Sequence, residues 1–184
     1  FSIKRGYQKA HDLKSDITVV VAGDGQMDTQ YLPNLIEPII EGTADYTKGD
    51  RLSSPQRKKM PAFRRFGNSI LTLLTKISTG YWHIIDPQNG YTAINKMALE
   101  NLLKEKITEG YGNPNDFLIG LNIHNFKVSD VEIPPLYGSE KSGIKIPTFI
   151  FKTMWILISG FFRRIHKKYG GLNFHPILMF FYLG

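Results

Sequence analysis

The stretch that decides the fold is a β-branched run ending in small and oxygen-bearing residues, Val19-Val20-Val21-Ala22-Gly23-Asp24-Gly25-Gln26-Met27-Asp28. Such a run predicts a buried parallel strand whose carboxyl end opens into a crevice, where α/β proteins bind ligands. Asp24 and Gln26 lie two residues apart, so in extended backbone their side chains project the same way, and the flanking glycines leave room for a diphosphate. Their hard oxygen atoms suit Mg²⁺ or Mn²⁺. Taken alone, the Asp-Gly pair is equally typical of a plain strand-ending turn.

Other elements follow from the same reading of periodicity and turn residues. A second strand is expected over residues 44–48, and Gly49-Asp50-Arg51 after it would lie at the same sheet edge as Asp24 if the two strands are parallel. Residues 83–93 predict a short strand broken by turn residues, and 126–133 the last strand. Helices are expected over residues 2–13, 31–40, 95–106 and 117–123, and from about residue 68. The chain is therefore predicted to be an α/β domain with a mostly parallel sheet flanked by helices.

The amino-acid composition and net charge limit which kinds of site and ligand the chain can have. The chain has 184 residues, 42% of them hydrophobic, and no cysteine, which excludes disulfides, thiolate metal sites and a cysteine nucleophile. Its net charge of +7 permits nucleic acid, anionic lipid or phosphate-bearing ligands. The basic side chains fall into two groups, and for each group a solvated surface is as typical as a binding role. Residues 48–65 hold seven basic side chains against one acidic one: Lys48, Arg51, Arg57, Lys58, Lys59, Arg64 and Arg65. Residues 163–168 hold four: Arg163, Arg164, Lys167 and Lys168.

Several motifs in order resemble the family 2 inverting glycosyltransferases of the GT-A fold, among them the polyprenyl-phosphate sugar transferases. The resemblance begins with residues 24–28 (DGQMD), continues through 31–36 (YLPNLI) and 44–51 (ADYTKGDR), and includes 86–91 (DPQNGY). It spans nearly all of the chain, from residue 6 to about 182. The segment in which the family has its first strand and base-binding motif is absent, so we interpret the sequence as a fragment with an incomplete donor site.

The resemblance implies roles for particular residues. The family's metal motif Asp-x-Asp-x-Gln matches residues 22–26, which makes Asp24 and Gln26 the expected ligands of Mg²⁺ or Mn²⁺, although Ala22 replaces the first Asp. Asp86 and Asp116 are the expected catalytic residues, and phosphate binding falls to a set drawn from three segments: Arg51, Asn89, Gly90, Lys141 and Ser142. An alternative for Asp116 is that it only caps the helix that follows it.

The tail differs from the rest of the chain. Residues 144–162 are aromatic and apolar, and the uninterrupted part, residues 153–162, is shorter than the roughly 20 residues of a spanning helix. With the basic group at 163–168 beside it, the tail predicts an amphipathic helix in the membrane interface with basic side chains reaching anionic phosphates. The alternative is a core helix packed on the sheet. Residues 174–184 resemble the opening of a membrane segment.

The predicted protein is thus a partial GT-A catalytic domain over residues 1–143 followed by a juxtamembrane tail over 144–184. The resemblance implies transfer of a sugar, with inversion, from a nucleotide-sugar donor to a polyprenyl phosphate (dolichyl or undecaprenyl) or a related cell-envelope glycan at the cytoplasmic face of the membrane. Two alternatives stay open: a basic module binding nucleic acid or membrane, and a non-catalytic member of the fold. Aromatic residues are not interleaved with the basic group at 48–65, so nucleic acid is not the expected partner. The sugar, the nucleotide and the oligomeric state do not follow from the sequence.

Overall fold

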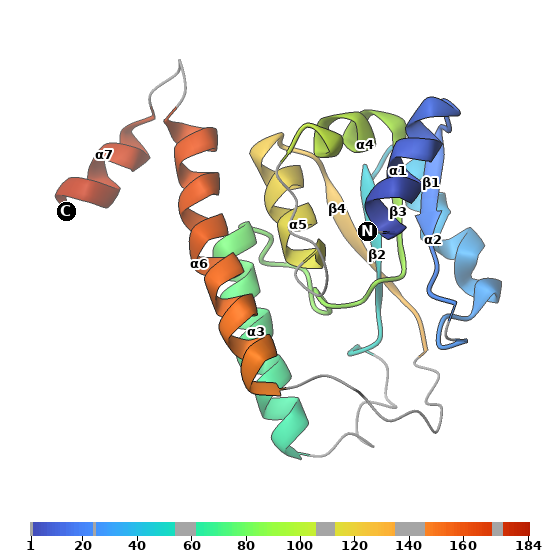
Figure 1. Ribbon diagram of the computed structural model, residues 1–184, viewed down its shortest axis with the longest axis horizontal. Helices are drawn as coiled ribbons and strands as arrows, with labels where there is room; N and C mark the ends of the chain where they lie inside the picture. Colours follow the sequence, from blue (N-terminus) through green and yellow to red (C-terminus); the bar gives the residue numbers. More distant parts are fainter. Residues whose placement is uncertain (1, 24, 54–61, 106–112, 135–145, 171–174) are drawn as a thin grey trace.

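Four strands form one sheet in the order β1-β3-β2-β4, and helices cover both of its faces (Figure 1). The computed structural model describes residues 2–23, 25–53, 62–105, 113–134, 146–170 and 175–184. The elements in chain order are α1 (Ser2–Asp12), β1 (Ile17–Val20), the 3-10 helix η1 (Thr29–Tyr31), α2 (Leu32–Ile40), β2 (Tyr46–Asp50), α3 (Ala62–Thr79), β3 (Thr92–Asn95), α4 (Lys96–Leu103), α5 (Asn113–Ile123), β4 (Val128–Glu132), α6 (Ile146–Tyr169) and α7 (Pro176–Leu183). The α/β class expected from the sequence is confirmed.

Three of the four strands run in the same direction. β1 and β2 each pair antiparallel with β3, and β2 pairs parallel with β4. The carboxyl ends of β1, β2 and β4 therefore meet at one edge of the sheet, together with the amino end of β3. This arrangement confirms the expectation that the segments after β1 and β2 share an edge.

Some boundaries differ from the sequence prediction. β1 was expected to be a buried parallel strand, but its residues are half-buried and it lies at an end of the described sheet beside an antiparallel neighbour. β2 extends to Asp50 rather than ending at Lys48, because Gly49 and Asp50 continue the parallel ladder with Val131 and Glu132 of β4. The segment before β3 forms turns, and the strand itself begins only at Thr92.

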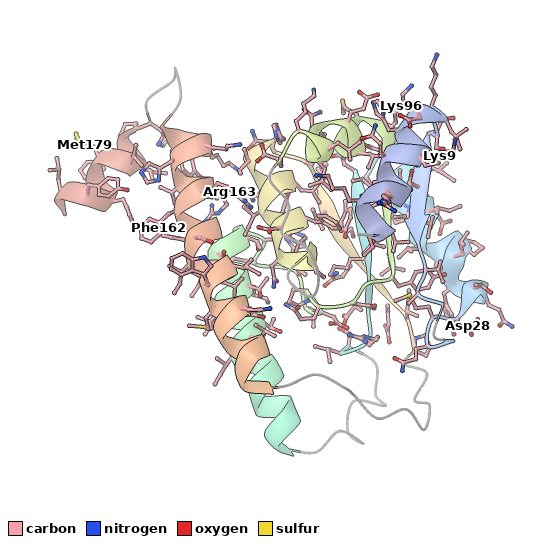
Figure 2. All side chains as sticks on the ribbon, viewed as in Figure 1. Lys9, Asp28, Lys96, Phe162, Arg163 and Met179 are labelled. Atoms are coloured by element: carbon pink, nitrogen blue, oxygen red, sulfur yellow. The ribbon has the colours of Figure 1, made fainter. Side chains whose placement is uncertain are left out.

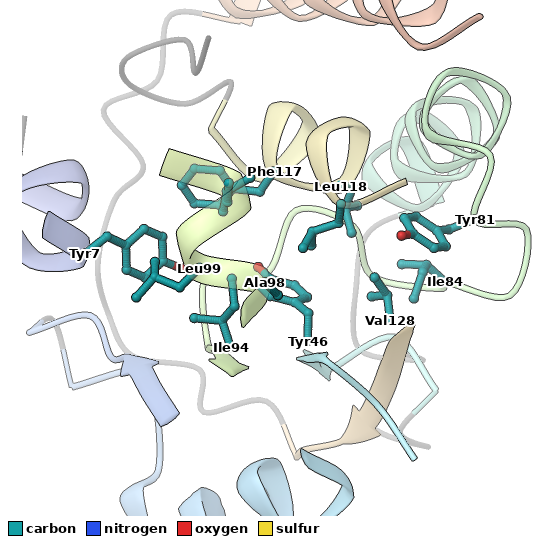
Figure 3. Close-up of a cluster of buried hydrophobic side chains, with 12 residues drawn as sticks. Tyr7, Tyr46, Tyr81, Ile84, Ile94, Ala98, Leu99, Phe117, Leu118 and Val128 are labelled. Atoms are coloured by element: carbon teal, nitrogen blue, oxygen red, sulfur yellow. The ribbon is translucent and has the colours of Figure 1, made fainter. Parts of the chain in front are cut away.

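Each face of the sheet has its own apolar core. On one face α1, α4 and α5 pack against β2, β3 and β4 around Tyr7, Tyr46, Ile94, Leu99 and Leu118, all buried (Figure 3). On the other face α2 packs through Leu35 and Ile39 onto Tyr91, Ala93 and Ile133. The alternation of side chains along the strands separates these two sets, since neighbouring residues point to opposite faces.

A helical pair extends the molecule beyond α5. α6 runs beside α3 and also contacts α5, and α7 lies at the far end of α6, away from the sheet (Figure 1). Gly160 permits the close approach of α6 to α5, because a Cβ there would lie 2.2 Å from Cδ1 of Ile119. No helix in the described ranges is long and apolar enough to cross a membrane.

The tail helix combines the two interpretations of its sequence. One side of α6 is buried through Thr153, Ile156, Leu157 and Ile165, as in a core helix. The other side exposes Trp155, Ile158 and Phe162, and α7 exposes Phe180, Phe181 and Tyr182 near them. The chain therefore has an exposed aromatic surface on α6 and α7, and we call these six residues the tail surface.

The four basic side chains at residues 163–168 of α6 are held by contacts within the protein, although that of Lys167 stays half exposed. Each contacts the protein: Arg163 pairs with Asp116, Arg164 donates to the carbonyls of Ile77 and Ser78, Lys167 pairs with Glu105, and Lys168 donates to Asn122. Arg164 thus satisfies carbonyls at the C-terminal end of α3. Packing of α6 on α3 and α5 places acceptors within reach of these four side chains, and their contact with lipid phosphates stays a prediction.

Candidate functional site

The polar motifs of the sequence meet at the edge where β1, β2 and β4 end and β3 begins. The 22–28 loop follows β1, Arg51 follows β2, and residues 86–91 enter β3. Ligands of open α/β sheets bind outside the carboxyl ends of the strands. The edge is therefore the natural place for a binding site.

Arg51 and Asp86 form the central contact of this edge. Nε of Arg51 lies 2.8 Å from Oδ2 of Asp86, Nη2 lies 3.3 Å from Oδ1, and the backbone N–H of Arg51 also donates to Oδ2. The Asp86 side chain is buried, whereas that of Arg51 is 41% exposed. A bidentate carboxylate holds a guanidinium in one orientation. Asp86 thus orients a partly exposed arginine at the rim.

Asp86 begins a tight turn, residues 86–90, that Asn89 holds onto β2. The Asn89 side chain donates from Nδ2 to the carbonyl of Gly49 at 2.7 Å and accepts at Oδ1 from the N–H of Tyr91. The N–H of Gly49 in turn donates to the carbonyl of Tyr91 at 2.9 Å. Asn89 is buried, so in this structure its amide fixes the backbone of the turn.

The 22–28 loop contacts the same turn, and Tyr91 directly after it, through Met27 and Asp28. The hydroxyl of Tyr91 donates to the carbonyl of Asp28 at 3.2 Å, and a Cβ added to Gly90 would lie 3.5 Å from Cε of Met27. Gly25 has a φ of +72°, a left-handed conformation that favours glycine. Gln26 is exposed beside it. The structure therefore brings the segment of the expected metal motif next to the 86–90 turn.

The expected metal ligands are only partly described. Asp24 lies outside the described residues, and among those the structure does describe, no group of three or more His, Asp or Glu could hold a metal ion. The donor set of the motif, one carboxylate and one amide oxygen, has the chemistry that Mg²⁺ and Mn²⁺ prefer when phosphate supplies further oxygens. Lys141 and Ser142 also lie outside the described residues.

Asp116 lies in the first turn of α5 and is buried. α5 begins at Asn113, three residues earlier, so the alternative that Asp116 is the N-cap is wrong. Its Oδ1 accepts a hydrogen bond from Nη2 of Arg163 at 2.7 Å. Arg163 comes from α6, as Figure 2 shows. The neighbouring Asn115 accepts from the side chain of Gln88 at 2.9 Å. The 86–90 turn thereby links Asp86 to the start of α5.

Two polar residues that the sequence reading did not assign lie beneath this edge. Lys48 was counted with the basic loop, but it is fully buried in β2. Burial lowers its pKa to about 8, although Asp86 and Asp130 oppose the shift. Burial also raises the pKa of Asp130, which pairs in register with Lys48, to about 6. Strand alternation was the available signal, since Lys48 shares the inward face with Tyr46 and Asp130 shares it with Val128.

The basic group at residues 48–65 is accordingly smaller than its sequence implied. Lys48 points into the protein and Arg51 is held by Asp86. Residues 57–59 lie outside the described part, and the side chains of Arg64 and Arg65 are not described. A nucleic-acid surface built on this group gains no support from the residues that can be placed.

Comparison with known proteins relates the chain to sugar transferases. It is 31% identical over 133 residues to a UDP-N-acetylglucosamine–dolichyl-phosphate N-acetylglucosaminyltransferase from Methanococcus voltae, covering 72% of this chain and 53% of that protein. It is 26% identical over 125 residues to an uncharacterized protein from Methanocaldococcus jannaschii, covering 67% of this chain and 51% of that protein. No family model matches. The chain spans about half the length of these curated relatives.

Solved structures support the fold. Glucosyl-3-phosphoglycerate synthase from Mycobacterium tuberculosis, bound to phosphoglyceric acid, superposes with a TM-score of 0.57 at 16% identity, covering 79% of this chain and 49% of that one. The same enzyme bound to Mn²⁺, UDP-glucose and phosphoglyceric acid also gives 0.57 at 17% identity, covering 79% of this chain and 50% of that one. At these identities the likeness concerns the fold alone, and it is the fold that the sequence motifs implied.

Proposed function

We propose that the protein, which belongs to the glycosyltransferases of the GT-A fold, transfers a sugar from a nucleotide-sugar donor to a polyprenyl phosphate, with inversion, at the cytoplasmic face of the cell membrane. The observation that carries the proposal is the meeting of the 22–28 loop, Arg51 and the 86–90 turn at one sheet edge. The relative that acts on dolichyl phosphate supports the class of acceptor.

The donor side of the proposed site is the 22–28 loop. Asp24 and Gln26 would hold Mg²⁺ or Mn²⁺, which supplies positive charge for the departing diphosphate when it is bound. Gly25 supports this role in two ways. Glycine readily adopts the left-handed conformation found here, and without a Cβ it would leave room for phosphate oxygens. Ala22 leaves the motif one carboxylate short of the family pattern.

The acceptor side is formed by Asp86, Asp116 and their neighbours. Arg51, oriented by Asp86, has the exposure to bind a phosphate oxygen, and Gly90, Lys141 and Ser142 complete the proposed phosphate-binding set. Asn89, which was expected in this set, is buried with its amide bonded to Gly49 and Tyr91, and it supports the set by holding the turn. An acceptor that is already a phosphate carries negative charge and needs little deprotonation. Asp86 and Asp116 are therefore proposed to orient the acceptor oxygen toward the sugar, with Arg163 holding the Asp116 carboxylate in place.

The tail surface supports association with a membrane. Trp155 is 72% exposed and Phe162 42%, and the Phe162 and Phe181 rings lie 6.3 Å apart, which joins the two helices into one apolar surface. Tryptophan and tyrosine favour the interface of a bilayer. A lipid acceptor would be presented at that interface, so we propose the membrane as the partner of this surface.

Donor binding tests the proposal directly. The melting temperature of the full-length protein should rise with UDP-N-acetylglucosamine or UDP-glucose, and more so with Mn²⁺, because a ligand stabilises the state that binds it. Asp24→Ala should abolish the part of the shift that depends on Mn²⁺. Asp16→Ala, an exposed carboxylate before β1, is the matched control and should keep the whole shift. An equal shift in wild type and Asp24→Ala, with and without Mn²⁺, would remove the metal role.

A further inference from the structure

Lys48 is an ionisable side chain in the middle of the sheet. It lies on β2, in register with Thr92 of β3 and Asp130 of β4, and it is fully buried. A buried ammonium is costly unless it is paired and hydrogen-bonded. Its Nζ donates to the backbone carbonyl of Asn89. The lysine therefore reaches up from beneath the sheet edge to the 86–90 turn.

Gly49 completes this attachment from the next position of the strand. Its carbonyl accepts from the Asn89 side chain at 2.7 Å, and its N–H donates to the Tyr91 carbonyl at 2.9 Å. A Cβ at Gly49 would lie 2.8 Å from Nδ2 of Asn89, so the asparagine can approach only a glycine here. Lys48 and Gly49 together fasten the backbone and the side chain of Asn89.

The fastened turn contains Asp86 and contacts the residue that precedes Asp116. Asp86 at its start orients Arg51, and Gln88 in its middle donates to Asn115, which precedes Asp116. Displacement of the turn would move Arg51 and loosen the link to α5 together. Misplacement of such groups by about 1 Å can lower turnover by about 100-fold.

We propose that Lys48 is a positioning residue that fixes the 86–90 turn from below and thereby sets the positions of Asp86 and Arg51 for sugar transfer. This inference rests on the proposed function. Lys48 itself has no exposed surface and touches no substrate, so it acts through Asn89.

The test compares Lys48→Met with a control on the same strand, Thr47→Val, in the full-length protein. Thr47 is equally buried, but its hydroxyl donates to the carbonyl of Leu35 on the opposite face of the sheet, away from the turn. Turnover and KM are measured with UDP-N-acetylglucosamine and dolichyl phosphate, below the melting temperature of every variant. Amide hydrogen exchange is measured in residues 86–91.

Lys48→Met is expected to lower kcat about 10- to 100-fold, with the KM for the nucleotide sugar changed less than about 3-fold, and to speed exchange in the turn. Thr47→Val is expected to keep kcat and exchange there. Lys48→Arg, which retains donors and charge, should recover at least part of kcat. Wild-type kcat in folded Lys48→Met, or equal losses in Lys48→Met and Thr47→Val, would overturn the proposal.

Should Lys48→Met fail to fold, Lys48→Arg takes its place. Slower turnover in proportion to faster exchange of the turn supports the positioning role, and faster exchange with unchanged kcat overturns it. Absence of transfer by the wild type would refute the proposed function instead, while the exchange measurements would still report whether Lys48 fastens the turn.

Discussion

At the scale of single residues, acidic and basic side chains of opposite charge lie close together beneath the partly exposed Arg51. Asp86 holds Arg51, and Lys48 and Asp130 lie side by side below them on β2 and β4. Asp130 accepts the N–H of Ile85 at 2.6 Å, yet burial dominates its titration and raises its pKa to about 6. A carboxylate kept in such a place makes the stability of the protein depend on pH.

Asp130 should lower stability as pH rises from about 4 to about 6. The folded carboxyl has a pKa of about 6, against 3.8 for an aspartate exposed to water, so in this window the folded state binds more protons than the unfolded state. The cost is therefore absent below pH 4 and fully present above pH 6. Asp130→Asn removes it, and the free energy of unfolding measured by urea from pH 4 to 7 should rise relative to wild type by up to about 3 kcal/mol. A difference between the two proteins that does not vary with pH would contradict this assignment.

The sequence alone indicated which residues belong to the candidate site at the sheet edge, but not which of them contact one another. Arg51, Asp86 and Asn89 stand in motifs whose residue types point to phosphate chemistry. That Asp86 binds Arg51, 35 positions away in sequence, depends on the pairing of β2 with β3, which local patterns do not specify. Arg163 was predicted to contact lipid because the sequence does not show that α6 packs on α5, where its partner Asp116 lies.

At the scale of elements, β2 shows how one strand serves both the core and the site. Its side chains alternate between the face of α2, where Thr47 donates to Leu35, and the face of α5, where Lys48 lies. Gly49 has a close contact on the α2 face, because a Cβ there would lie 2.9 Å from Cδ1 of Ile133. The strand tolerates little added volume at this position.

Gly49→Ala should destabilise the protein by about 1–3 kcal/mol, since the added methyl group meets both Asn89 and Ile133 in a packed region. Gly6→Ala is the matched control: nothing lies within 4 Å of a Cβ on α1 there, and alanine should stabilise the helix by about 0.5–1 kcal/mol. Chemical denaturation of both variants measures the two effects. A Gly49→Ala protein as stable as wild type would show that the turn can move away from β2 at little cost.

The tail surface should bind membranes through apolar contact more than through charge. The basic side chains at residues 163–168 contact the protein, whereas Trp155 and Phe162 are exposed. Replacing both by serine should weaken binding to liposomes about 10-fold or more, because each exposed aromatic contributes roughly 1.5–3 kcal/mol when buried. Raising salt from about 50 to 500 mM should change wild-type binding less than about 3-fold.

Met97→Ser, which removes an exposed apolar side chain from α4, controls for a general loss of surface hydrophobicity and should bind like wild type. Cosedimentation with vesicles containing anionic lipid gives the measurement. Binding that is abolished by salt and unaffected by the aromatic substitutions would mean that the basic residues leave their partners in the protein and reach the lipid.

Helices and strands were easier to place from sequence than their ends. The apolar periodicity of α2 and the alternation of β4 give both elements within a few residues. The predicted start of β3 was too early in the sequence, because residues 86–91 contain turn residues and an aromatic residue together. The tertiary contacts of Asn89 decide where the strand pairing begins. α6 was predicted to be either interfacial or core: one of its sides packs as in a core helix, while its place at a membrane interface stays a prediction.

At the scale of the whole molecule, the sheet edge gathers segments that lie far apart in sequence, and α6 joins that edge to the tail surface. α6 contacts α5 next to Asp116 on one side and exposes aromatics on the other. The proposed division into a catalytic part over residues 1–143 and a juxtamembrane part over 144–184 therefore has a direct link through Arg163. The GT-A fold could be inferred from ordered motifs, whereas this link required the packing of α6.

The central claim is that this sheet edge transfers a sugar from a nucleotide to a lipid phosphate. The most direct measurement incubates the full-length protein with radiolabelled UDP-N-acetylglucosamine or UDP-glucose, Mn²⁺ and either dolichyl phosphate in vesicles or 3-phosphoglycerate. We expect label in the lipid fraction with the wild type, and none there with Asp86→Ala or Asp116→Ala. Label found only in the water-soluble acceptor, or full transfer by both variants, would contradict it.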